Sequence, residues 1–202
     1  MEEIKDGDID KIFLQIQKEL RKIKTEIKDL ETKGPDKELT GWPEFHGPGF
    51  VLKIPGGFEE VEREKAATVF FSKNRPQIVL INSNEYAGLT FQTARLEHGK
   101  SVLKLEDEGE RIRQILKQAD GKNVFYDQGS VSGYVPALWF EYKSFAADER
   151  VYNLMFLFLS SGKLMIGTFY CIFQNYDRWK PKILKMLETI QTGEAECERI
   201  QS

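Results

Sequence analysis

Hydrophobic residues are densest between residues 151 and 192, where the chain reads as two apolar runs followed by a helical pattern. In the first run, 151–159, every residue except Asn153 is apolar, so both faces of the predicted strand are hydrophobic. Such a strand must be covered on both sides, which places it in the middle of a layered domain. The following Ser-Ser-Gly-Lys, residues 160–163, predicts a tight hairpin turn into the second run, with Gly162 free to adopt a positive φ.

Two amphipathic helices are predicted by apolar residues spaced three and four apart. The last helix follows a turn at Gln174-Asn175 and can lie on the preceding hairpin. Its stripe comprises Trp179, Ile183, Met186, Leu187 and Ile190. The other helix covers about residues 104–119, and Gly121 is well placed to end it. Its stripe comprises Leu105, Ile112, Ile115, Leu116 and Ala119.

Short apolar runs between turn residues predict further strands. Residues 50–54 alternate as an edge-type strand that ends at Pro55-Gly56-Gly57, and the polar stretch 58–65 is expected to hold a helical turn. The remaining strands are expected at 68–71, 77–82, 89–96, 123–132 and 136–144. Because short turns join consecutive strands, their pairing must be antiparallel. The predicted fold class is therefore α+β, an antiparallel β-sheet flanked by helices.

A heptad pattern precedes this domain, between about Asp8 and Thr32. The seam residues are Ile9, Phe13, Ile16, Leu20, Ile23, Ile27 and Leu30. They predict an N-terminal amphipathic, coiled-coil-like helix. Two interpretations stay open: the helix packs on its own domain, or it forms a coiled coil or partner-binding arm, because a free helix of this length is marginal in water.

Composition shifts divide the chain into four parts. We expect a helical arm at 1–33, a linker at 34–49, a sandwich domain at 50–192 and a polar tail at 193–202. The Gly and Pro density of the linker rules out a helix or a central strand there.

Charge and composition argue against several classes of partner and indicate a cellular location. The 202 residues are 41% hydrophobic and 30% charged, with a net charge of −3, so there is no electrostatic reason to bind nucleic acid or an anionic membrane. No apolar run approaches the roughly 20 residues that span a bilayer. Without a basic, then apolar, N-terminal signal pattern, the expected location is cytoplasmic.

No catalytic, metal or cofactor motif is found. The two histidines, His46 and His98, lack a second ligand at metal-binding spacing. Cys171 lies in an apolar strand, which keeps a thiol protonated and inert. The segment 129–133 has Val131 where a nucleophile elbow needs serine, and no glycine-rich phosphate loop precedes a helix. We therefore expect a protein that is not an enzyme and carries no cofactor.

Several segments carry a resemblance to known proteins. The order of elements, opening with Phe-x-Leu-x-Ile-Pro at 50–55, resembles the PsbP/Mog/DcrB-type α/β/α sandwich. The segments 72–79, 139–146, 152–156 and 179–181 are also similar to a group of uncharacterised bacterial proteins of this kind. The resemblance covers roughly 50–192 and leaves the arm outside. It implies a binding or accessory role, as in chaperone-like adaptors, by analogy of fold alone.

Three sets of residues are candidates for binding. The first set is Asn74 and Arg75, in the turn before Pro76. Arg75 presents a fixed guanidinium to a partner, or it ties the turn to its own domain. Trp139 and Tyr142 are core residues or part of an exposed aromatic patch. The third set comprises the arm residues Phe13, Leu20, Ile23 and Ile27.

The function predicted from these features is a non-enzymatic, cytoplasmic protein-interaction or adaptor module. Its partner is another protein, or a second copy that associates through the N-terminal helix. The alternative is a small-ligand-binding domain with a pocket between sheet and helix.

Overall fold

The computed structural model of the chain describes residues 39–62, 76–94, 104–146 and 149–193. The chain divides into two units, 1–41 and 42–202, and every helix and strand described below belongs to the second. Several predictions fall outside the described residues. They concern the N-terminal helix with Phe13, Leu20, Ile23 and Ile27, the strand at 68–71, the Asn74–Arg75 turn, and the tail from 194 onward.

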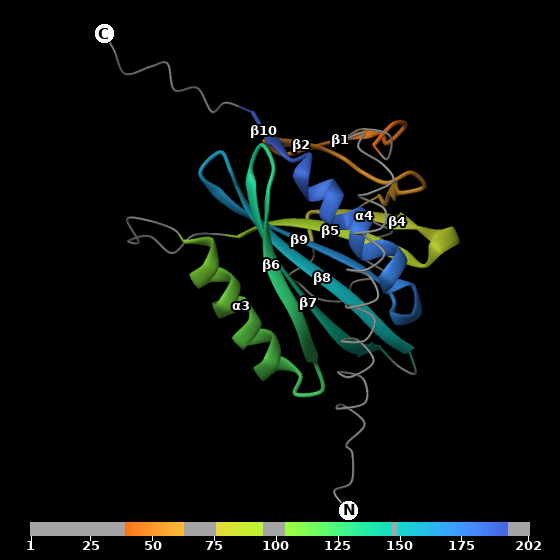
Figure 1. Ribbon diagram of the computed structural model, residues 1–202, viewed down its shortest axis with the longest axis vertical. Coiled ribbons are helices and arrows are strands. Elements are labelled where there is room, and N and C mark those ends of the chain that lie inside the picture. Colours follow the sequence, from red (N-terminus) through yellow and green to blue (C-terminus); the bar gives the residue numbers. More distant parts are fainter. Residues whose placement is uncertain (1–38, 63–75, 95–103, 147–148, 194–202) are drawn as a thin grey trace, which may run out of the picture. The chain divides into compact units, whose positions relative to one another are not determined.

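A seven-stranded antiparallel sheet forms the centre of the domain (Figure 1). Its order is β3 (Glu59–Glu60), β4 (Ile78–Asn82), β5 (Ala87–Ala94), β9 (Lys163–Ile172), β8 (Glu149–Ser160), β7 (Pro136–Ala146) and β6 (Val124–Ser132). The doubly apolar run predicted to be central is β8, which pairs with β7 on one side and β9 on the other. Its residues from Tyr152 to Phe158 are all buried. The prediction of a central antiparallel hairpin is confirmed.

The β8–β9 turn has the backbone that the sequence predicts. Ser161 and Gly162 are its two central residues, with φ of 48° and 72°. Positive φ at both positions is what a two-residue type I′ turn requires, and only Gly162 adopts it without steric cost. The turn holds the register from the Ser160–Lys163 pair to the Val151–Ile172 pair.

A second sheet of three strands corrects two predictions. It contains β1 (Glu44–Gly47), β2 (Phe50–Lys53) and β10 (Gln191–Thr192), with β2 in the middle. Residues 44–47, expected in the linker, therefore form a strand. The ring of Phe45 stacks on Phe91 at a centroid distance of 5.7 Å, which holds this segment to the domain. The strand expected at an edge, β2, is central because β10 returns to pair with it.

Helices cover opposite faces of the large sheet. The helix α3 (Leu105–Ala119) packs on a cluster from β7, β8 and β9 through Leu105, Ile112 and Leu116. The helix α4 (Tyr176–Glu188) packs on the other face, where Trp179 lies 5.3 Å from the ring of Phe169. The small sheet covers the rest of that second face. The α+β prediction, an antiparallel sheet flanked by helices, is confirmed for these two helices.

Two local details differ from what the sequence predicted. The helix α3 ends at Ala119 with an extended Asp120, whose N–H donates to the Leu116 carbonyl, while the Asn123 amide donates to the same oxygen at 3.0 Å. Side-chain and backbone donors thus end the helix, and Gly121 does not. In the stretch 58–65, expected to hold a helical turn, Glu59–Glu60 form β3 by pairing with β4, and residues 63–65 lie outside the described part of the chain. Two further short elements, η1 (Ser83–Glu85) and η2 (Phe173–Asn175), are 3-10 turns.

Candidate functional site

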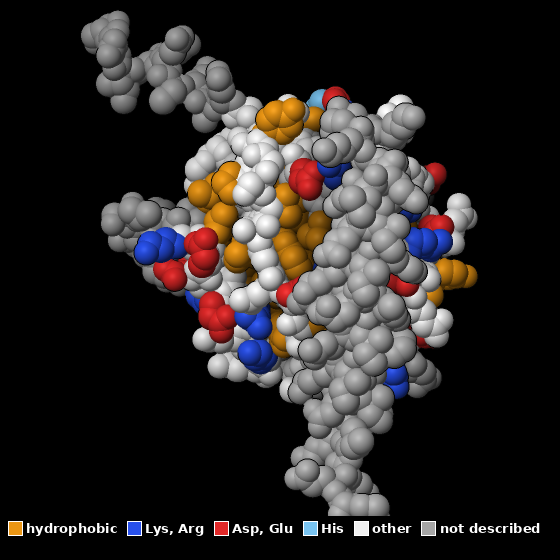
Figure 2. All heavy atoms as spheres, in the orientation of Figure 1, with side chains coloured by type: hydrophobic (Ala, Val, Ile, Leu, Met, Phe, Trp, Pro, Cys, Tyr) orange, Lys and Arg blue, Asp and Glu red, His pale blue; other side chains and the backbone are white. Residues whose placement is uncertain are grey.

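The strand β6 is a long edge of the large sheet. It has nine residues and, among the described strands, pairs on one side only, whereas the opposite edge, β3, has two residues. Natural edge strands are usually protected by shortness, proline or charge. Residues 128–132 of β6, Gln-Gly-Ser-Val-Ser, have none of these protections. Figure 2 shows the β6 region as a pale band of backbone and uncharged polar side chains with hydrophobic surface on both sides.

Half of the backbone polar groups of β6 point away from the sheet. In an antiparallel sheet each residue directs its N–H and C=O to one side, and the side alternates along the strand. The Val61 N–H donates to the Val79 carbonyl at 2.9 Å, which fixes this alternation beside β4. The registers of the successive strand pairs extend this alternation from β4 to β6. They show that the backbone N–H and C=O groups of Gly129 and Val131 point toward β7. The residues whose groups point outward are Gln128, Ser130 and Ser132.

One of these outward donors is already satisfied. The Gln128 N–H donates to Asp127 Oδ1 at 3.0 Å. Among the described residues, the Ser130 and Ser132 N–H groups have no such partner. Their side chains are exposed, as is that of Gln128. The segment 128–132 is called the β6 edge below.

A small pocket lies between α3 and the β6 edge. Its volume is about 210 Å³. The lining residues are Glu106, Gly109, Glu110, Arg113, Gln128, Gly129, Leu138, Trp139 and Phe140. A Cβ on Gly109 would stand 2.4 Å from Leu138 Cδ2, so glycine allows the helix to approach the sheet this closely.

Arg113 connects α3 to β6 at this pocket. Its guanidinium donates to Glu110 at 3.2 Å and to the side-chain oxygen of Gln128. It also lies over the rings of Phe125 and Phe140, at 5.5 and 6.0 Å from their centroids. Within the described part of the chain, the buried Nε of Arg113 has no hydrogen-bond acceptor. The pocket therefore combines an apolar floor with a fixed positive group at its side.

A polar cluster lies on the opposite face of the sheet, under α4. Glu141 is only 4% exposed, and its two carboxylate oxygens accept from Tyr152 Oη at 2.7 Å and Lys180 Nζ at 2.9 Å. Lys180 also contacts Asp127 at 3.4 Å and lies 4.8 Å above the Trp139 ring. These five residues are called the Glu141 cluster. They join α4 to β6, β7 and β8.

A β-bulge brings β6 into this cluster. The register shifts between Phe125 and Gln128, so that Tyr126 and Asp127 together lie opposite Glu141. A bulge redirects side chains at the place where a strand gains a residue. Here Asp127 satisfies the Gln128 N–H with one oxygen and contacts Lys180 with the other. The β6 edge, residues 128–132, therefore begins directly after the bulge.

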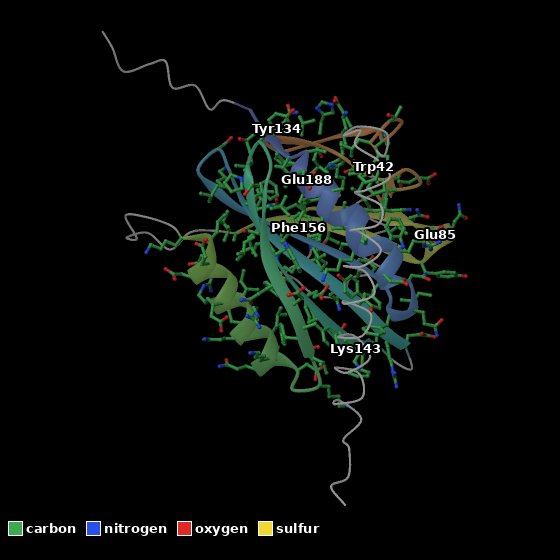
Figure 3. The ribbon with its side chains drawn as sticks, in the orientation of Figure 1. Trp42, Glu85, Tyr134, Lys143, Phe156 and Glu188 are labelled. Atoms are coloured by element: carbon green, nitrogen blue, oxygen red, sulfur yellow. The ribbon has the colours of Figure 1, made fainter. Side chains whose placement is uncertain are left out.

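The β6–β7 turn packs on the end of α4. A Cβ on Gly133 would stand 2.3 Å from the Glu188 carbonyl oxygen, so the turn needs glycine there. Figure 3 shows Tyr134 and Glu188 at this end of the domain and Lys143 at the other. Tyr134 is 78% exposed. The β6 edge thus runs between a helix on each face and ends at an exposed aromatic side chain.

The two strand residues proposed from sequence lie on opposite faces of β7. Trp139 belongs to the Glu141 cluster, and Tyr142 stacks on Phe125 under α3 at 5.3 Å. Each is 7% exposed, so they do not form an exposed patch together. Burial raises the pKa of Tyr142 to about 12.

The sequence interpretation missed Glu141 and Lys143, which are both buried. Lys143 lies over the rings of Phe145 and Phe173 at 5.4 and 5.5 Å. The signal was present in the segment 139–143, Trp-Phe-Glu-Tyr-Lys, where charged residues two apart occupy one face of an apolar strand. The β6 edge carried no such signal, because its exposure depends on the strand order.

Three other features of the described residues bear on function: a buried thiol, the metal-ligating side chains and the length of the helices. Burial raises the pKa of Cys171 to about 12, as expected for an inert thiol. No group of three or more metal-ligating side chains is found in residues 39–62, 76–94, 104–146 and 149–193. No described helix is long and apolar enough to cross a membrane.

Comparison with known proteins gives the fold. No family model matches the chain, and no curated protein matches it. The PsbP of the cyanobacterium Synechocystis (CyanoP) is similar in structure, with 14% identity, a TM-score of 0.57, and coverage of 80% of this chain and 98% of that one. A point mutant of protein Mog1 has 10% identity, a TM-score of 0.51, and coverage of 77% and 97%. The Saccharomyces cerevisiae Ran-binding protein Mog1p has 10% identity, a TM-score of 0.49, and coverage of 75% and 96%.

The first two likenesses define a class of fold. The domain has a PsbP/Mog1-like fold, in agreement with the resemblance of its element order. At such low identity they show the fold alone.

Proposed function

We propose that this domain is a non-enzymatic protein-interaction module that binds an extended segment of a protein along the β6 edge. The observation that supports this is an unpaired, uncharged edge whose Ser130 and Ser132 donors point outward. In strand addition, main-chain hydrogen bonds provide affinity and alternate side chains provide specificity. The module acts by binding, and its partner is a protein.

The surroundings of the β6 edge supply two places for side chains of the added strand. Successive residues of a strand point to opposite faces. One set would face the pocket beside Arg113 and Leu138. The other set would face the surface beside Trp139 and α4. The Glu141 cluster holds α4 in position there through Lys180.

A second candidate function is binding of a small ligand in the α3 pocket. The specific observation in its favour is the convergence of Arg113 and Gln128 over an apolar floor. Its volume of about 210 Å³ is smaller than the roughly 300–1,000 Å³ of typical ligand pockets. The pocket is closer in size to one side chain, which favours the peptide.

The proposed function is tested with a displayed library of random ten-residue peptides, a length comparable to the nine residues of β6. Peptides selected on the full-length protein are measured against Ser130→Pro and against Ser130→Thr as the matched control. Proline removes the outward N–H, so we expect affinity to fall about tenfold, while threonine changes it little. Equal binding to the proline variant would show that the peptides bind elsewhere and would overturn the proposal.

A further inference from the structure

The β6 edge is complementary to itself. Placed antiparallel to a second β6, Ser130 faces Ser130 of the partner subunit, and each N–H can donate to the other's C=O. Two residues away, each Ser132 N–H faces the C=O of Gln128 of the partner subunit. The Gln128 N–H, which would face a carbonyl there, is already bonded to Asp127. The outward donors of one edge thus find acceptors on an identical edge.

The side chains at this seam allow close approach. Around the two-fold axis every residue meets a copy of itself or of a near neighbour, so a charge there would meet a like charge. The residues of the β6 edge are small or neutral. The nearest charge in the strand, Asp127, is held under α4 by Lys180.

The charges of α3 favour a second copy over an unrelated strand. The first turn of α3 is acidic, and Arg111, Arg113 and Lys117 follow it. A two-fold axis through the β6 seam keeps both α3 helices on the same face and makes them antiparallel. Gly109 packs on Leu138, which pairs with Ser130 near the axis.

This geometry predicts one particular pair of charges across the seam. Arg113 contacts Gln128, which would face Ser132 of the partner subunit. Gly109 lies at the level of the two-fold axis. Arg113 lies on one side of Gly109 along α3, and Glu106, which also lines the pocket, lies on the other side. Arg113 of each copy is therefore brought toward Glu106 of the partner subunit. An arbitrary peptide would not supply this complementarity.

From these observations we infer that the strand bound at the β6 edge is the β6 edge of a second copy, in a two-fold dimer with one continuous sheet. This inference rests on the proposed function of β6 as a pairing edge. The dimer closes on itself, because the opposite edge of the sheet, β3, has two residues and cannot continue the pairing.

The test measures the mass of the full-length protein by light scattering over a range of concentrations. Variants are made in the wild type and in a Leu20→Asp/Ile23→Asp background, which removes the apolar seam predicted for the arm. We expect a dimer in both backgrounds. Ser130→Pro should raise the dissociation constant at least about tenfold while the subunit keeps a cooperative thermal melt, because proline is tolerated where an edge N–H faces solvent.

A charge pair tests the orientation. Glu106→Lys should weaken the dimer several-fold and more than Asp107→Lys, which makes the same change of charge at a position that does not line the pocket. Equal effects of the two variants would overturn the antiparallel arrangement.

A monomer in both backgrounds, or a dimer unaffected by Ser130→Pro, would overturn the inference. Neither result decides the proposed function. Random peptides that bind wild type and not Ser130→Pro would still support strand addition from a different protein. A protein that is monomeric and also selects no such peptides would remove both.

Discussion

At the scale of single residues, the unusual feature is charge buried in the strand β7. Glu141 and Lys143 are 4% and 3% exposed. A buried charge is tolerated only with partners, because losing water costs several kcal/mol per ion. Glu141 has two, Tyr152 and Lys180. Lys180 belongs to α4, so the buried carboxylate of Glu141 is stabilised only when α4 is packed on the sheet.

Lys180→Met tests this dependence. It removes the cation and leaves Glu141 buried with one donor, so we expect a loss of about 3–5 kcal/mol of unfolding free energy. Adding Glu141→Gln to the same chain should recover part of it, because the neutral amide needs no cation. Urea denaturation measures both. A loss below about 1 kcal/mol, or a double variant as unstable as the sum of the singles, would contradict this role.

Tyr142 predicts how stability depends on alkaline pH. Burial raises its pKa from 10.0 to about 12 in the folded protein. Below pH 10 the phenol is neutral in both states and its contribution is complete. Between about pH 10 and 12 it ionises in the unfolded chain first, so stability falls by about 2–3 kcal/mol. Chemical denaturation at several pH values should show a smaller alkaline loss for Tyr142→Phe. The exposed control Tyr134→Phe should behave as wild type.

At the scale of elements, the sequence predicted what local patterns encode. The β8–β9 hairpin and the helices α3 and α4 follow from apolar spacing and a glycine turn within short stretches of chain. The strand at 50–54 was predicted but the small sheet was not, because Val51 pairs with the distant Gln191 and the short strands β1 and β10 have no distinctive pattern of their own. The bulge in β6 was also missed, since it is visible only against β7.

Two prolines test the direction of the backbone groups in β6. Val131 directs its N–H toward β7, so Val131→Pro removes a ladder hydrogen bond and leaves an acceptor unpaired. We expect a loss of at least about 2 kcal/mol. Ser130→Pro, one residue earlier, should cost less than about 1 kcal/mol because its N–H faces outward. Thermal and urea unfolding compare them directly, and a larger loss for Ser130→Pro would reverse the assigned direction.

At the scale of the whole molecule, the candidate site depends on strand order. The strands β6 to β9 follow one another as a meander, which consecutive turns predict. The strand β9 then pairs with β5, and this leaves β6 at the edge of the sheet. The pairing of β5 with β9 joins segments that are far apart in the chain. Periodicity describes each strand alone and carries no information about its neighbours. Trp139 could therefore be proposed from sequence, and the β6 edge could not.

The N-terminal heptad residues lie outside the described part of the chain and remain a prediction. Leu20→Asp with Ile23→Asp should leave the domain from residue 42 onward folded while it removes any association through the arm. Thermal melts with light scattering distinguish the two interpretations. An early melt with a monomeric mass before and after the change would mean that this helix is part of the core.

The strand β10 ties the last described residues to β2, near the start of the domain. Val51 pairs with Gln191, which lies 140 positions later in the sequence. On the ribosome, β2 therefore emerges long before its second neighbour has been synthesised. During that interval the small sheet cannot be completed around Phe50, which in the finished protein packs on Phe91 and Phe158. The nascent chain must avoid aggregation until Gln191 and Thr192 have left the exit tunnel, so translation sets the earliest moment at which the small sheet can be complete.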